Sequence, residues 1–237
     1  MKHTQMRNSI LCAAMAAALL ACGGGGDDAY GPTKEPLTVA ADGSTSFDAT
    51  RLAATLQALP RVAPSTQEQD WLATMREEEK LAHDIYARLD SQWGAQTRTF
   101  ANIAQSESTH TEAVRQLLVR YALPDPTSAL APGVFVDAEM QALYTALTDA
   151  GAVSRVKALG VGAAVEELDI LDIQRALQVV DNEDIRMVLL NLMKGSRNHL
   201  RSFVGAMLAQ GEAYLPQYLD RATYDAIVNS PHERGGA

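Results

Sequence analysis

Residues 99–121 read TFANIAQSESTHTEAVRQLLVRY. Their apolar and small side chains recur at steps of three and four residues, the spacing of one helix face: Phe100, Ile103, Ala104, Val114, Leu117 and Leu118. Glu107 and His110 fall in the phase of this apolar face, and side chains three residues apart on a helix point the same way. The stretch therefore predicts a helix that carries a carboxylate and an imidazole into the protein interior.

Other segments show the same helical spacing: residues 66–93, 154 or 157 to 180, 181 to about 210, and a shorter one at 220–229. Ser65 and Glu68 form a capping-box pattern at the start of the first of these segments. Together with residues 99–121, the segments predict an all-α domain over residues 65–230.

A long connection separates the second and third long helices. Pro124, Pro126, Pro132 and Gly133 break any regular pattern there, apart from a short helical stretch at 137–149. A connection of this length can reach the other end of a bundle, as it does in ferritin-like folds. The chain shows no alternating pattern of a strand pair. We therefore expect a four-helix bundle with a long crossover between helices two and three and a short C-terminal helix.

Each long helix offers at least one metal-type ligand on its apolar face: Glu79, Glu107 with His110, Glu166, and His199. Buried carboxylates are costly unless they are protonated or neutralised by cations. Carboxylate and imidazole ligands suit iron or manganese. The pattern predicts a centre of one or two such ions.

Each ligand also has a purely structural interpretation. Residues 77–80 are typical of a charged helix face, His199 of a hydrogen-bonded core histidine, and residues 166–172 of an exposed acidic patch. The occurrence of these residues on four helices in ferritin-like order favours the metal centre. Two histidines without such support are expected at the surface: His83 and His232.

Two motifs carry a family resemblance. Glu79-Lys80-Leu81-Ala82-His83-Asp84-Ile85-Tyr86 resembles the first helix of rubrerythrin-type proteins, and residues 100–117 resemble their second helix. Nearly all of residues 66–230 is similar to the ferritin-like family known as domain of unknown function 2202. The resemblance implies metal ligation by Glu79, Glu107, His110 and His199, with Glu166 as the third-helix ligand. It also allows a homodimer.

The resemblance departs from a full di-iron pattern at Ser196, where a second Glu-x-x-His motif would need Glu three residues before His199. Asp169, one turn after Glu166, is a candidate for the missing carboxylate, and Glu167 is its alternative. Glu78 replaces Glu79 if the helix phase shifts by one residue. The expected centre is therefore asymmetric.

The N-terminal segment is typical of an export signal. Lys2 and Arg7 precede an apolar run that ends at Cys22, which predicts a cleaved lipoprotein signal over residues 1–21 and a lipid on Cys22, with an ordinary secretory signal as the alternative. Residues 22–64 are expected to be a flexible linker with one short helix near 50–59, and residues 231–237 a disordered tail. The chain would then lie on the periplasmic side of a bacterial envelope, anchored to the outer membrane.

Charge and thiol content limit the function further. The net charge is −9, and loss of Lys2 and Arg7 makes it −11, so nucleic acid is a poor partner. With residues 1–21 removed and Cys22 lipidated, no thiol remains as a ligand. We expect a lipid-anchored metal-binding protein with oxidase- or peroxidase-type activity. The alternatives are a metal-sequestering protein and a degenerate bundle that acts as an envelope interaction module.

Overall fold

The structure, a computed structural model, describes residues 35–234. These residues form an all-α bundle with one small two-stranded sheet: β1 (Leu37–Val39), β2 (Thr45–Phe47), α2 (Ala49–Ala58), α3 (Thr66–Trp93), α4 (Thr99–Arg120), α5 (Ala138–Ala152), α6 (Arg155–Leu177), α7 (Glu183–Leu208) and α8 (Arg221–Val228). The fold class predicted from the sequence is confirmed, and the helix ends agree within a few residues.

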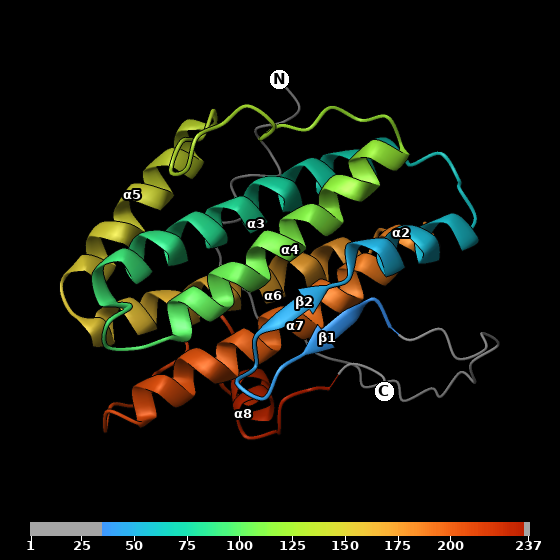
Figure 1. Cartoon of the computed structure of the whole chain (residues 1–237). Helices are drawn as coiled ribbons and strands as arrows, with labels where there is room; N and C mark the ends of the chain where they lie inside the picture. The colour runs from blue at the N-terminus through green and yellow to red at the C-terminus, as the bar shows by residue number, and fades with distance from the viewer. Residues whose placement is uncertain (1–34, 235–237) are drawn as a thin grey trace. The chain divides into compact units, whose positions relative to one another are not determined.

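The four long helices pack as two pairs, α3 with α4 and α6 with α7 (Figure 1). Residues 121–154 pass from one end of the bundle to the other, and α5 within them packs on α3 and α6. Lys80 and Asp84 of α3 form an ion pair that holds this connection, because Lys80 Nζ donates to Ala131 O and Asp84 accepts from Gly133 N. The long crossover thus brings the second helix pair against the first.

Side-chain caps fix the starts of α2, α3, α5, α6 and α8. The Ser65 capping box is present at the start of α3. Glu68 of that box also accepts hydrogen bonds from the backbone N–H groups of Asp181 and Asn182. One carboxylate therefore ties the start of α3 to the start of α7.

The expectation of a flexible linker was wrong for residues 37–47, which form two strands, whereas the short helix expected near residues 50–59 is present as α2. β1 and β2 pair antiparallel, with Leu37 opposite Phe47 and Val39 opposite Thr45. Gly43, at a φ of 85°, provides the turn that a residue with a Cβ would strain. β2 packs on α4 (Figure 1). Strands of three residues are too short to show an alternating pattern, so periodicity could not predict them.

The expectation of a disordered tail was also wrong for residues 231–234. Glu233 forms ion pairs with Arg197 and Arg201 of α7. His83 and His232, both expected at the surface, are both partly buried. The predicted signal over 1–21, its Cys22, and residues 235–237 lie outside the described residues.

Among residues 35–234, no helix is both long and apolar enough to cross a membrane.

Candidate metal centre

The five predicted ligands from four helices lie together in the bundle interior. Glu79 comes from α3, Glu107 and His110 from α4, Glu166 from α6 and His199 from α7. Each of these side chains is at most 5 % exposed. The interpretations as a solvated charged face and as an exposed acidic patch therefore do not hold for Glu79 and Glu166.

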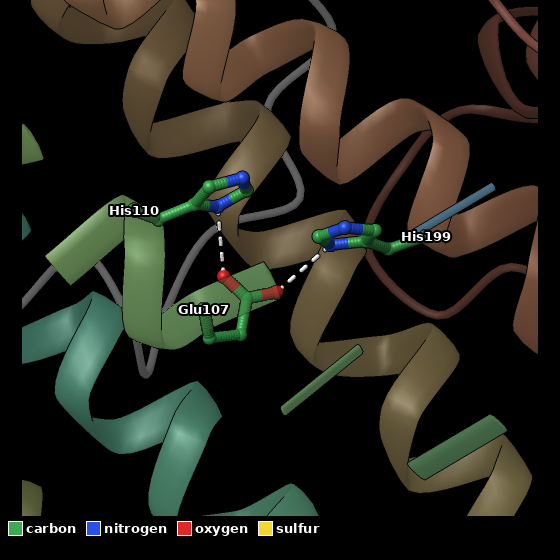
Figure 2. A group of neighbouring side chains, drawn as sticks. All are labelled: Glu107, His110 and His199. Carbon is green, nitrogen blue, oxygen red and sulfur yellow. Dashed lines mark ion pairs between the residues drawn. The ribbon is translucent and has the colours of Figure 1, made fainter. Parts of the chain in front are cut away.

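Glu107 lies at the centre of the cluster, between the two histidines (Figure 2). Its Oε2 atom is 2.8 Å from Nδ1 of His110, and its Oε1 atom is 2.8 Å from Nδ1 of His199. The two imidazole rings are stacked, with centroids 5.3 Å apart and planes 16° from parallel. One carboxylate thus presents a separate oxygen to each histidine.

A further carboxylate approaches each histidine from the outside. Glu79 Oε2 lies 3.3 Å from Nδ1 of His110, and Glu166 Oε2 lies 3.5 Å from Nδ1 of His199. Each Nδ1 atom therefore faces two carboxylates, and the five residues form a row in the order Glu79, His110, Glu107, His199, Glu166.

Several atoms of this row have no hydrogen-bond partner among the described residues: Glu79 Oε2, Glu107 Oε1, Glu166 Oε2 and His199 Nδ1. Buried polar atoms without partners are rare and costly. Ligand atoms of Glu107, His110 and His199 lie within 4.8 Å of one another, so this trio could hold a metal ion. A cation among the unpartnered atoms would satisfy them, and the residues present fit that role.

The electrostatics of the row favour charge on its central members. Burial alone raises the pKa of Glu107, but the positive charges of His110 and His199 outweigh it and hold that pKa far below its usual range. Burial alone lowers the pKa of both histidines, but the charge of Glu107 outweighs it. The pKa of His110 rises to about 10 and that of His199 to about 9. Without metal, Glu107 and the two imidazoles therefore stabilise one another's charged forms.

The outer carboxylates behave differently. Burial raises the pKa of Glu79 to about 7, and burial also raises the pKa of Glu166. Tyr86 of α3 donates a hydrogen bond of 2.7 Å to Glu166 Oε1. This bond leaves Glu166 Oε2 as the oxygen that faces His199.

Thr45 of β2 is a member of the site that the sequence did not indicate. Its Oγ1 atom lies 2.8 Å from Nε2 of His110 and 3.1 Å from Nε2 of His199. The contact joins residues 65 and 154 positions apart in the chain, so no local motif could have revealed it.

Glu167 and Asp169, the two candidates for the carboxylate absent at Ser196, have different surroundings. Both oxygens of Glu167 accept hydrogen bonds from the C-terminal segment, from the hydroxyl of Tyr214 and from backbone N–H groups of residues 217–219. Glu167 is thereby taken up in holding that segment, so it is a poor alternative ligand. Asp169 is partly exposed, and its pKa is raised well above the usual value by burial and by the charges of Glu166 and Glu79. The charges that shift the pKa of Asp169 thus belong to two members of the row.

Glu78 and Ser196 lie outside the row. Glu78 is buried, and burial together with the charges of Asp172 and Glu79 raises its pKa well above the usual value. Ser196 is buried and donates to the backbone carbonyl of Leu192 in its own helix. A short hydroxyl therefore occupies the position at which a symmetric motif would place a carboxylate.

Comparison with known proteins identifies relatives of the whole helical unit. Residues 68–231 match a family described as an uncharacterized protein domain, DUF2202. The chain is 46% identical over 180 residues to the uncharacterized protein MJ0754 of Methanocaldococcus jannaschii, an alignment that covers 76% of this chain and 96% of the relative. The crystal structure of the hypothetical protein MJ0754 from Methanococcus jannaschii has a TM-score of 0.71 and 45% identity, covering 74% of this chain and 99% of that one.

Proposed function

The chain belongs to the DUF2202 family, and from that premise we propose that it is a ferritin-like metalloprotein with a dinuclear iron or manganese centre. The observation that carries the proposal is the position of Glu107, which presents one oxygen to each of two buried histidines. The connectivity of two helices, a long crossover and two helices is that of ferritin-like bundles.

The row divides into two half-sites that share Glu107. One half-site is formed by His110, Glu107 Oε2 and Glu79, and the other by His199, Glu107 Oε1 and Glu166. Each contains one imidazole nitrogen and two carboxylates, ligands that suit iron and manganese. The pairing supports two ions rather than one.

The charges of the carboxylates in the row are compatible with two divalent ions and with an asymmetric centre. Glu79, Glu107 and Glu166 supply three negative charges when ionised, so two divalent ions leave one positive charge. Asp169, whose pKa responds to the charges of Glu166 and Glu79, is the nearby carboxylate that could balance it. Ser196 leaves the His199 half-site with one carboxylate fewer than a symmetric motif would supply.

Bound iron or manganese would supply one-electron redox chemistry with oxygen or peroxide. The protein itself binds and orients the ions, and it excludes bulk water because all five ligands are buried. That burial restricts any co-substrate to small molecules. The same closed arrangement also favours metal sequestration as a second candidate function.

The test is metal loading of the mature chain, purified without chelator and titrated anaerobically with ferrous or manganous ion. We expect about two ions per chain for the wild type and about one or fewer for His110→Ala. His83→Ala is the matched control, because His83 is a partly exposed histidine on α3. Less than about one-tenth of an ion per chain for the wild type would refute the proposal. Oxygen or peroxide consumption by the ferrous form then separates an oxidase from a store.

We also propose that the protein is exported and anchored in the cell envelope by a lipid on Cys22. The support is the sequence pattern of Lys2, Arg7 and the apolar run before Cys22. Incorporation of labelled palmitate into the wild type but not into Cys22→Ser tests this. Equal labelling of the two proteins, or no labelling of either, would contradict it.

A further inference from the structure

We propose that Thr45 is a positioning residue of the metal centre. Its hydroxyl holds both imidazoles in the form with a proton on Nε2, so that both Nδ1 atoms are free to bind metal. The inference rests on the proposed function, since it assigns the protein group that prepares the two histidine ligands.

The two histidine rings share the same distribution of contacts. In both histidines Nδ1 faces carboxylates, whereas Nε2 lies within 3.1 Å of the same hydroxyl oxygen of Thr45. A neutral imidazole carries one proton, and a metal can bind only the nitrogen that lacks it. The nitrogen that must lose its proton is therefore the one facing the carboxylates, and the proton is kept on the side of Thr45.

The hydroxyl group of Thr45 has the hydrogen-bonding capacity to serve both rings. The oxygen of a threonine side chain has two lone pairs, so it can accept one hydrogen bond from each Nε2–H. If the hydroxyl donated to one Nε2 instead, that ring would carry its proton on Nδ1 and could not bind metal. Acceptance from both rings is the arrangement in which both half-sites are competent.

Thr45 is itself held by the helices that carry the histidines. Its backbone N–H donates a 2.8 Å hydrogen bond to Ser106 Oγ of α4. At the hairpin turn, the backbone carbonyl of Asp42 accepts a 2.6 Å bond from Ser202 of α7, and its carboxylate accepts a 2.7 Å bond from Asn102 of α4. The hydroxyl therefore has a fixed place relative to α4 and α7.

Packing around the rings supports the same role. The ring of Phe47 meets His110 edge-on, with centroids 5.7 Å apart and planes at 81°. A Cβ at Gly195 would lie 2.5 Å from Cε1 of His110 and 3.4 Å from Thr45 Oγ1. The absence of a side chain at Gly195 leaves room for the ring and the hydroxyl to meet.

The experiment compares Thr45→Val, which removes the hydroxyl at nearly constant volume, with Thr45→Ser, which keeps it. Thr38→Val is the matched control, because Thr38 is an exposed threonine on β1 of the same hairpin. Cobaltous ion is titrated into each full-length mature protein against a competing chelator, and the visible absorption spectrum reports the ligand field. We expect Thr45→Val to lose about 10- to 100-fold in affinity and to change the spectrum. Thr45→Ser should restore both, and Thr38→Val should match the wild type.

A second measurement separates this proposal from the existence of the metal centre. Long-range proton–nitrogen NMR spectra of the metal-free proteins report which ring nitrogens carry protons. We expect slowly exchanging Nε2–H signals for His110 and His199 in the wild type and in Thr45→Ser, and rapid exchange in Thr45→Val. Unchanged signals in Thr45→Val overturn the role of Thr45. A wild type that shows the signals but binds no cobalt, iron or manganese refutes the proposed function and leaves the role of Thr45 supported.

Discussion

Nδ1 of His199 lies 2.8 Å from Oε1 of Glu107, and the two atoms face each other without a further hydrogen bond from the described part of the chain. Two ligand atoms about 2 Å from a shared metal ion are roughly 3 Å apart when they occupy neighbouring coordination positions. The separation in this pair matches that geometry. In the metal-free protein a proton on Nδ1 fills this contact, and a bound cation would take its place.

Replacement of Glu107 by Gln should impair both half-sites at once. The amide keeps the shape of the side chain but loses the charge that both imidazoles face. We expect metal affinity to fall by more than tenfold, the smallest loss typical even for groups that only orient ligands. Glu112→Gln is the control, because Glu112 is a half-exposed glutamate of α4 that pairs with Arg115. Isothermal titration with manganous ion measures the difference, and equal affinities would contradict the bridging position of Glu107.

The stability of the metal-free protein should fall as pH rises from 6.5 to 9. The pKa of His110 is raised to about 10 and that of His199 to about 9. A raised pKa means that the folded state holds its proton more tightly than the unfolded state, whose histidine pKa is about 6.5. The stability that this supplies is complete below the unfolded pKa and is lost as pH rises through the folded values.

Urea unfolding in the presence of a chelator at pH 6.5, 7.5 and 9 measures this dependence. Glu79 acts in the same direction, because burial raises its pKa to about 7 and its folded form also retains a proton. Metal affinity should change oppositely, since binding releases these protons. Stability that stays level or increases over this interval would show that the imidazoles are not protonated in the metal-free protein.

Gly195→Ala and Gly205→Ala should have opposite effects although both lie in α7. A Cβ at Gly195 would lie 2.5 Å from Cε1 of His110, whereas nothing lies within 4 Å of one at Gly205. Alanine is favoured over glycine inside a helix by about 1 kcal/mol, so Gly205→Ala should raise the free energy of unfolding by up to about that amount. Gly195→Ala should lower it by about 1–3 kcal/mol because the core is overpacked. Paired denaturant titrations check the signs, and stabilisation by both changes would be inconsistent with the packing around His110.

Tyr86→Phe should destabilise the metal-free protein by about 1–3 kcal/mol, because it leaves a buried carboxylate oxygen of Glu166 without its 2.7 Å hydrogen bond. Tyr218→Phe provides the comparison, since Tyr218 is 44% exposed. Chemical unfolding of both variants measures the effect. A loss no larger for Tyr86→Phe than for Tyr218→Phe would indicate that the ring of Tyr86 contributes by packing alone.

Helical periodicity predicted the bundle, and together with the family resemblance it predicted the residues of the row. The phase of Glu107 and His110 with Phe100 and Leu117 placed them inside, and the structure buries them. The same reasoning could not choose between Asp169 and Glu167 for the carboxylate absent at Ser196, because a shift of one residue in helix phase exchanges which side chains face inward. What separates them is the C-terminal segment that occupies Glu167, a contact between parts of the chain far apart in sequence.

The β1–β2 hairpin, in contrast to the helices, could not be predicted from the sequence. Strands of three residues give no periodic signal, and a segment rich in small and polar residues is normally assigned to a linker. Its stability comes from tertiary contacts, such as the hydrogen bond of Thr45 to Ser106 and the burial of Leu37 and Phe47. These contacts form only when the hairpin packs on the assembled bundle, so sequence patterns do not reveal them.

The hairpin also has a practical consequence for defining the functional unit. The family match begins at residue 68, whereas the hydroxyl that contacts both imidazoles belongs to residue 45. A recombinant fragment that begins at residue 68 would keep the five residues of the row. It would lose the Thr45 hydroxyl, which contacts the Nε2 atoms of both imidazoles. A recombinant fragment for expression, or for the engineering of new metal sites, should therefore begin upstream of β1, near residue 35. It then contains the β1–β2 hairpin as well as the helices.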